Sequence, residues 1–139
     1  MCFSVLIIDD SKMDRFISET VIEKTSFARH VVSYSTVADG LNYLQSLISA
    51  PEKLPQVIFL DVNLPAMDGF DFLDNFLKLS EDVQKRCTVF MVSATSSVAN
   101  LERIKEYPVV RKFFNKPLTP EILKDVHVYM IKQPIFQHK

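Results

Sequence analysis

Five short apolar runs alternate along the chain with longer segments in which apolar residues recur every three or four positions. Short apolar runs are typical of buried strands, and the longer spacing is typical of amphipathic helices. The pattern predicts strands over 3–8, 29–34, 56–60, 87–92 and 109–114. It predicts helices over 12–25, 37–49, 69–79 and 97–106, and a last helix that begins at Thr119-Pro120-Glu121 and stops before Pro134.

Each predicted helix has one apolar face, which we expect to pack on the sheet. The segment 12–25 gathers Met13, Phe16, Ile17, Thr20 and Val21 on one face, and the segment 97–106 gathers Val98, Leu101 and Ile104. The apolar positions of the last helix are Ile122, Val126 and Met130.

Five consecutive strand–helix units predict an α/β fold in which a parallel sheet is covered by helices on both faces. The strands at 29–34 and 109–114 carry charged residues such as Arg29 and Lys112, so we expect them at the two edges. The other three runs are almost purely apolar and suit the centre. This gives the strand order 2-1-3-4-5 of a doubly wound, flavodoxin-like (βα)5 fold.

Length and composition exclude several classes of function. A chain of 139 residues fits one domain, and a net charge of −1 without a basic stripe argues against nucleic-acid binding. Two glycines are too few for a glycine-rich phosphate loop. Without a basic start or a long apolar run, neither a signal peptide nor membrane insertion is expected, and the cytoplasm is the expected compartment. We expect Cys87 to be a plain buried thiol.

Polar residues follow four of the strands: Asp9 and Asp10, then Asp61, Ser93 and Lys116. The carboxyl ends of parallel strands meet at one edge of the sheet, where ligands bind. Two carboxylates about 5 Å apart repel by roughly 3 kcal/mol at an effective dielectric near 20. One lysine is too little for three acids, so we expect Mg²⁺, which prefers oxygen ligands. Capping of the next helix by an acid is the alternative explanation of the Asp9–Asp10 pair.

A carboxylate beside a metal and a lysine can attack phosphorus to give an aspartyl phosphate. Asp61 follows the central strand and is therefore the best candidate nucleophile. Since the chain lacks a nucleotide loop, the phosphoryl group has to arrive already activated on another molecule.

Four motifs, "IIDDS", "FLDVNLPAMDGF", "VSA" and "NKP", resemble in their order and spacing the receiver domain of two-component response regulators, over about residues 3–132. The resemblance implies a stand-alone, chemotaxis-regulator-like receiver domain at 1–133, or one cut from a longer protein, with a short tail at 134–139. Its partners would be a sensor histidine kinase or a histidine phosphotransfer protein and an unknown downstream protein. Substrate turnover is not expected of it.

The resemblance also implies roles at the site. Asp61 accepts the phosphoryl group from a phosphohistidine, Asp10 binds Mg²⁺ directly, and Asp9 assists through water. Asn63 offers its backbone carbonyl to the metal. Ser93 and Lys116 bind phosphoryl oxygens.

Further roles fall outside the immediate cluster. Pro117 would follow a cis peptide bond that aims Lys116 into the site, and Asp68 and Gly69 would shape the loop after the nucleophile, where glycine suits strained backbone. Phe113 stands at the switch aromatic position, where tyrosine is common; plain packing on an edge strand is the alternative explanation. Asn63 and Thr95 occupy variable positions that tune phosphoryl lifetime.

The expected switch links the site to a surface. Phosphorylation draws Ser93 inward, Phe113 rotates, and the face made by helix 97–106, strand 109–114 and the last helix changes its affinity for a partner. Two alternatives remain. A pseudo-receiver would keep the fold without phosphorylation, and a haloacid-dehalogenase-type phosphohydrolase would need an acid where Asn63 stands. Ile135 and Phe136 in the tail are expected to dock on the domain.

Overall fold

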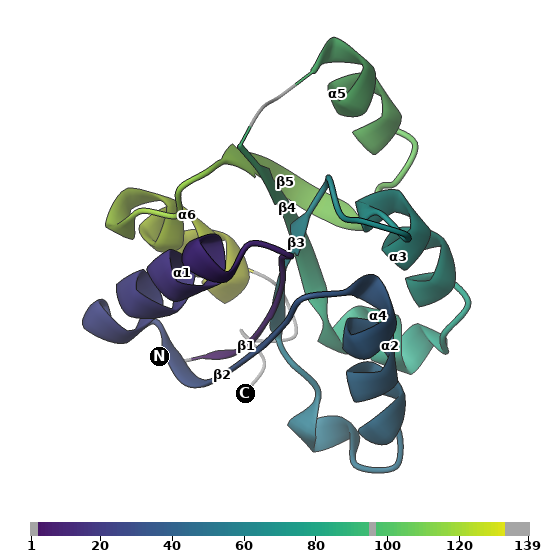
Figure 1. Ribbon diagram of the computed structural model, residues 1–139. Coiled ribbons are helices and arrows are strands. Elements are labelled where there is room, and N and C mark those ends of the chain that lie inside the picture. Colours follow the sequence, from purple (N-terminus) through teal and green to yellow (C-terminus); the bar gives the residue numbers. More distant parts are fainter. Residues whose placement is uncertain (1–2, 95–96, 133–139) are drawn as a thin grey trace.

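The computed structural model describes residues 3–94 and 97–132, and the predicted Thr95 position and tail docking by Ile135 and Phe136 lie outside them. A five-stranded parallel sheet forms the centre of the molecule (Figure 1). Its order is β2-β1-β3-β4-β5, which confirms the predicted topology. The strands are β1 (Phe3–Ile8), β2 (Ala28–Tyr34), β3 (Val57–Asp61), β4 (Thr88–Ser93) and β5 (Val110–Asn115).

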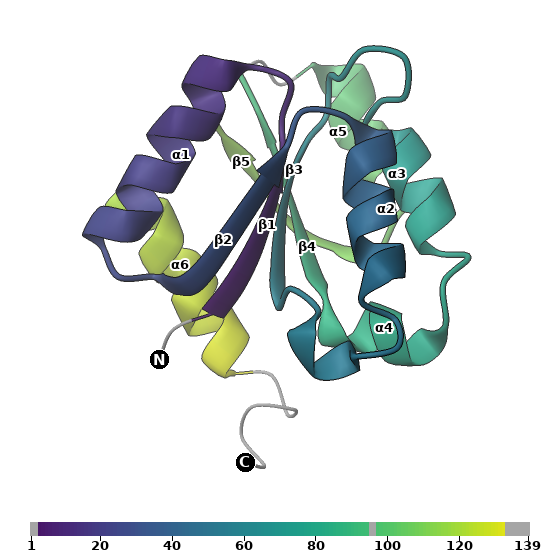
Figure 2. The same ribbon diagram turned by 60° about the horizontal axis from the view of Figure 1, so that its bottom comes forward.

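Helices cover both faces of the sheet. They are α1 (Lys12–Lys24), α2 (Val37–Ser46), α3 (Gly69–Phe76), α4 (Glu81–Arg86), α5 (Val98–Ile104) and α6 (Pro120–Ile131), with a 3₁₀ turn at Pro51–Lys53. Figure 2 shows α1 and α6 on one side of the strands and α2, α3 and α4 on the other. This two-sided cover explains why the central strands are apolar at most positions.

Side-chain alternation along the strands divides the core into two clusters. Along β3, Ile58 and Leu60 belong to the cluster beneath α2 and α3, whereas Val57 and Phe59 belong to the cluster beneath α1 and α6. All four side chains are at most 1% exposed. Successive residues of a strand point to opposite faces, so one continuous apolar run supplies both halves of the core.

The predicted inward face of α1 was wrong in its first two turns. Met13 and Phe16 are 72% and 69% exposed, whereas Ile22 is fully buried. At about 100° per residue, Arg15 lies about 20° and Asp14 about 80° from the direction set by Ile22, whereas Phe16 and Met13 lie about 120° and 180° from it. Polar residues, both of intermediate exposure, thus occupy the less exposed side of this part of the helix.

The predicted apolar face of α5 does not reach the core either. Val98 is 77% exposed and Leu101 is 38% exposed, and Ile104 only packs partly against the core. Helix α4 was not predicted, since Val83 is its one apolar residue. In α6 the buried residues are Leu123, Val126 and Met130, so Leu123 takes the position expected for Ile122.

The fold buries the thiol of Cys87, which lies between α4 and β4 and is 3% exposed. Burial raises the pKa of this thiol to about 12, whereas an unfolded cysteine ionises near about 8.5. The folded chain keeps the proton, so raising the pH above about 9 favours unfolding and lowers the free energy of unfolding.

We predict that, in a Cys2→Ser background, a thiol reagent at pH 8 labels Cys87 roughly a thousand-fold more slowly in the native protein than in denaturant. Labelling followed by absorbance measures both rates. Comparable rates in native buffer and in denaturant would contradict the burial of this thiol.

Candidate functional site

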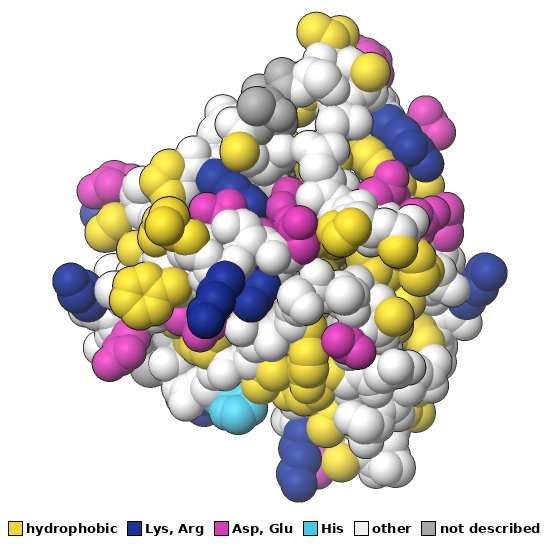
Figure 3. All heavy atoms as spheres, in the orientation of Figure 1, with side chains coloured by type: hydrophobic (Ala, Val, Ile, Leu, Met, Phe, Trp, Pro, Cys, Tyr) yellow, Lys and Arg dark blue, Asp and Glu magenta, His cyan; other side chains and the backbone are white. Residues whose placement is uncertain are grey.

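The predicted polar residues meet at the carboxyl edge of the sheet. Asp9 directly follows β1, Asp61 is the last residue of β3, and Ser93 is the last residue of β4. All three are buried, with 2%, 5% and 1% of their surface exposed. Lys116 directly follows β5 and is only 12% exposed in its side chain. Acidic and basic side chains lie together in the middle of the face seen in Figure 3.

Three carboxylates share the ammonium of Lys116. Its Nζ lies 2.6 Å from Asp9 Oδ2, 3.0 Å from Asp61 Oδ2 and 3.0 Å from Asp14 Oδ2. An ammonium carries three hydrogens, so these contacts use its full donor capacity. Burial alone would lower the pKa of Lys116, but the hydrogen bonds to the three acids outweigh burial and raise it. Lys116 therefore stays charged.

Burial has the opposite effect on the pKa of Asp61. It raises the pKa of the Asp61 carboxyl above its ordinary value, and the hydrogen bond and charge of Lys116 oppose that rise without cancelling it. The backbone N–H of Asn63 donates to Asp61 Oδ1 at 3.2 Å. Asp61 is therefore a carboxylate with one oxygen fixed by backbone and the other by an ammonium.

Asp9, Asp10 and Asp61 form a group that could hold a metal ion. Each offers a carboxylate oxygen, and these oxygens all lie within 4.8 Å of one another. Asp9 and Asp61 are buried, while Asp10 is exposed and gives access from solvent. Hard oxygen ligands in small number, with an open side, suit Mg²⁺, which retains several waters. The chemistry of the donor set thus fits this ion.

Backbone contacts hold the cluster in register. The N–H of Lys116 donates to the carbonyl of Ser93 at 2.8 Å, which fixes the loop after β5 to the end of β4. The Lys116–Pro117 peptide bond is cis, as predicted. The Asn63 amide lies 3.5 Å from the Ser93 hydroxyl, at the limit of a hydrogen bond. The predicted metal contact of the Asn63 carbonyl stays a prediction.

The start of α1 adds residues that the sequence reasoning missed. Ser11 caps α1, and its own N–H donates to Asp9 Oδ1 at 2.9 Å. The Arg15 guanidinium donates to the Asp9 carbonyl at 2.8 Å. Asp14, the third residue of α1, accepts a hydrogen bond from Lys116. The one available signal was the cap itself, because Ser11 followed by an acid three residues later marks a helix start.

The loop after Asp61 depends on a capping box and a close approach. Asp68 and Asp71 cap the start of α3 reciprocally, with both bonds at 2.9 Å. The expected backbone strain does not fall on Gly69, since the positive φ of this loop is at Ala66, with φ 64°. Gly69 instead packs so closely that an added Cβ would lie 2.6 Å from the Asp61 carbonyl oxygen.

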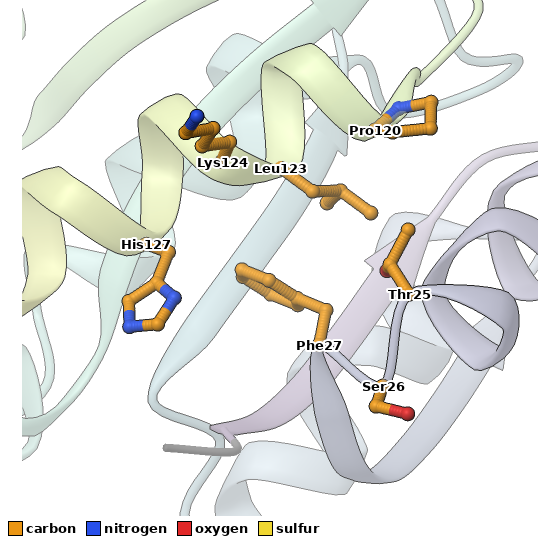
Figure 4. A pocket seen from close by; sticks show the side chains of 7 residues that line it. All are labelled: Thr25, Ser26, Phe27, Pro120, Leu123, Lys124 and His127. Atoms are coloured by element: carbon orange, nitrogen blue, oxygen red, sulfur yellow. The ribbon is translucent and has the colours of Figure 1, made fainter.

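Phe113 lies on β5, beside Met91 of β4, and packs half-buried against the core cluster beneath α2 and α3. Its role as a switch stays a prediction. A separate hollow of about 310 Å³ lies between the end of α1 and α6, with Phe27 and Leu123 facing each other across it (Figure 4). It contains none of the predicted site residues, and we assign it no part in the chemistry.

The fold and the site define a doubly wound α/β module with an acid–lysine cluster where the strand order reverses. The chain matches the family model of the response regulator receiver domain over residues 5–127. It therefore belongs to the response regulator receiver domain family of two-component signalling. Among the described residues, no helix is long and apolar enough to cross a membrane.

Individual relatives are distant. The chain is 27% identical over 131 residues to the sensor histidine kinase CheAY of Helicobacter pylori, a match over 94% of this chain and 15% of that protein. It is 26% identical over 101 residues to protein-glutamate methylesterase/protein-glutamine glutaminase 2 of Methanospirillum hungatei, over 73% of this chain and 25% of that protein. The chain thus spans a small part of both relatives.

A solved two-component response regulator from Cytophaga hutchinsonii has the same fold. It superposes with a TM-score of 0.88 at 23% identity, over 96% of this chain and 100% of that chain.

We predict that Lys116→Met lowers the free energy of unfolding by about 3 kcal/mol at neutral pH, because it leaves buried carboxylates without a cation. Part of the loss should return as the pH falls toward the carboxyl range. Lys112→Met, on the strand that Lys116 follows, is the matched control, since its ion pair with Asp125 is exposed and should contribute less than about 1 kcal/mol. Equal losses in urea denaturation would contradict a buried cluster.

We predict that Gly69→Ala lowers the free energy of unfolding by about 2 kcal/mol or more, because the backbone carbonyl of Asp61 cannot move aside for the methyl group. Gly40→Ala is the control. There the added Cβ meets only side-chain atoms of Ile8, which shift at lower cost than backbone, and alanine is the better helix former by about 1 kcal/mol. A smaller loss for Gly69→Ala than for Gly40→Ala in urea denaturation would overturn this explanation.

Proposed function

We propose that Asp61 accepts a phosphoryl group from a phosphohistidine of a sensor histidine kinase or a histidine phosphotransfer protein. The observation that carries the proposal is the position of the Asp61 carboxylate, which both contacts the Lys116 ammonium and belongs to the converging acid group. Family membership places the chain in phosphorelay signalling, and this geometry supports Asp61 as the acceptor.

The reaction forms one bond and breaks one. A carboxylate oxygen of Asp61 attacks phosphorus, the phosphorus–nitrogen bond to the donor imidazole breaks, and its electron pair stays on the nitrogen. The product is an aspartyl phosphate and a histidine. Bound Mg²⁺, held by Asp9, Asp10, Asp61 and the Asn63 carbonyl, would supply positive charge opposite the phosphoryl oxygens.

Lys116 and Ser93 act on the transferred group. The Lys116 ammonium exchanges its hydrogen bond with Asp61 Oδ2 for one with a phosphoryl oxygen, and the Ser93 hydroxyl donates to another. Ser93 ends β4, and its carbonyl accepts a hydrogen bond from the Lys116 N–H. A displacement of Ser93 would therefore move both the loop after β4 and the loop after β5.

We propose that the signal leaves through α5, β5 and α6. Val98 and Leu101 expose apolar surface on α5, and Phe113 is half-buried on β5. An inward rotation of Phe113 would change this face and its affinity for a downstream protein. Phosphorylation shifts the two arrangements only by its differential stabilisation of one of them.

We predict that a small phosphoryl donor with Mg²⁺ adds one phosphoryl group to the wild-type chain, seen as a mass increase of the intact protein. Asp61→Asn removes the nucleophile and should abolish the increase, as should a chelator. Asp82→Asn neutralises an exposed acid paired with Arg86 and should leave labelling unchanged. An unmodified wild type would favour a pseudo-receiver, and release of phosphate over many turnovers would favour a phosphohydrolase.

A further inference from the structure

Asp14 is the one acid on Lys116 that neither the family motifs nor the proposed transfer uses. Its Oδ2 lies 3.0 Å from Lys116 Nζ, and its side chain is 35% exposed. The converging group found among the described residues consists of Asp9, Asp10 and Asp61, and Asp14 stands outside it. Its contact with Lys116 therefore requires a separate explanation.

The three acids on Lys116 differ in what happens to them during transfer. Under the proposed function, Asp61 becomes an acyl phosphate, a mixed anhydride, and its own carboxylate charge is lost, while Asp9 gains the metal as a second cation. Asp14 keeps its full charge and its place beside the ammonium throughout. An incoming phosphoryl oxygen must therefore share Lys116 with Asp14.

The charge of Asp14 and its distance from Asp61 determine whether it favours cation or phosphoryl binding. The Asp14 and Asp61 oxygens are no further apart than two 3.0 Å hydrogen bonds laid end to end. At that separation a carboxylate attracts a divalent cation at the acid group and repels a phosphoryl group on Asp61. The partial exposure of Asp14 weakens both effects by solvent screening.

We infer that Asp14 is a positioning residue that acts through Lys116: it holds the ammonium from the α1 side and sets the balance between cation and phosphoryl binding at the site. The inference rests on the proposed function and adds a residue that regulates it. If Asp14 tunes the site electrostatically, its charge should change the affinities for Mg²⁺ and for a phosphoryl group in opposite directions. If Asp14 only supports the structure, both affinities should change in the same direction.

The test is Asp14→Asn, which keeps the shape of the side chain and an oxygen acceptor for Lys116 while removing the charge. We expect Mg²⁺ affinity, measured by calorimetry, to fall roughly three- to ten-fold at low salt. At saturating Mg²⁺, affinity for the phosphoryl analogue beryllium fluoride should rise by roughly the same factor. Both changes should shrink as salt is added.

Two variants serve as controls. Asp39 occupies the same third position of α2, after the cap Thr36, that Asp14 occupies in α1 after Ser11. Asp39→Asn therefore removes an equivalent helix-start charge on the opposite face of the sheet from α1 (Figure 2), and we expect neither affinity to change by more than about two-fold. Asp14→Glu keeps the charge and should restore the wild-type balance between the two affinities.

The outcomes separate the inference from the proposed function. Opposite changes in Asp14→Asn support the inference. If the wild type binds both Mg²⁺ and the analogue, and both affinities fall together or stay unchanged in Asp14→Asn, the inference fails and the proposed function stands. If the wild type binds neither, both fail.

Discussion

The ammonium of Lys116 is shared by carboxylates that reach it from the end of β1, the start of α1 and the end of β3. Buried acids this close would repel strongly without it, and an isolated buried charge is costly. The ends of β1 and β3 and the start of α1 are therefore placed in relation to one side chain. The cluster has more negative than positive charge, which leaves it suited to accept a further cation.

The sheet was predictable because its signal is dense and redundant. Runs such as Val57–Leu60 are buried on both faces, so every residue in them had to be apolar, and the charged strands had to lie at the edges. The same logic brought Asp61, Ser93 and Lys116 together, since strand ends of a doubly wound sheet meet at one place.

The errors of prediction arose where polar residues face inward or apolar residues face out. Asp14 and Arg15 lie on the less exposed side of α1, where they bond to Lys116 and to the Asp9 carbonyl. A count of apolar spacing turns the helix by more than a quarter turn, toward Met13 and Phe16. Helix α4 buries only Val83, and its signals were the Ser80 cap and charges ordered along the helix dipole. Tertiary contacts set the inward face of α1, and capping residues define α4. Neither produces a periodic spacing of apolar residues in the sequence.

The backbone around the site forms a fixed frame, whereas the ion pairs within it involve side chains that can exchange partners. Backbone bonds set the frame: the N–H of Gly69 donates to the Val62 carbonyl at 3.0 Å, and the N–H of Lys116 donates to the Ser93 carbonyl at 2.8 Å. The ion pairs on Lys116 can then be exchanged without breaking these bonds, because they involve side chains alone. A transfer reaction needs its groups held in place before the charge moves, since reorganisation during the reaction would add to the barrier. The site therefore combines an excess of negative charge with backbone hydrogen bonds that hold the loops around it in place.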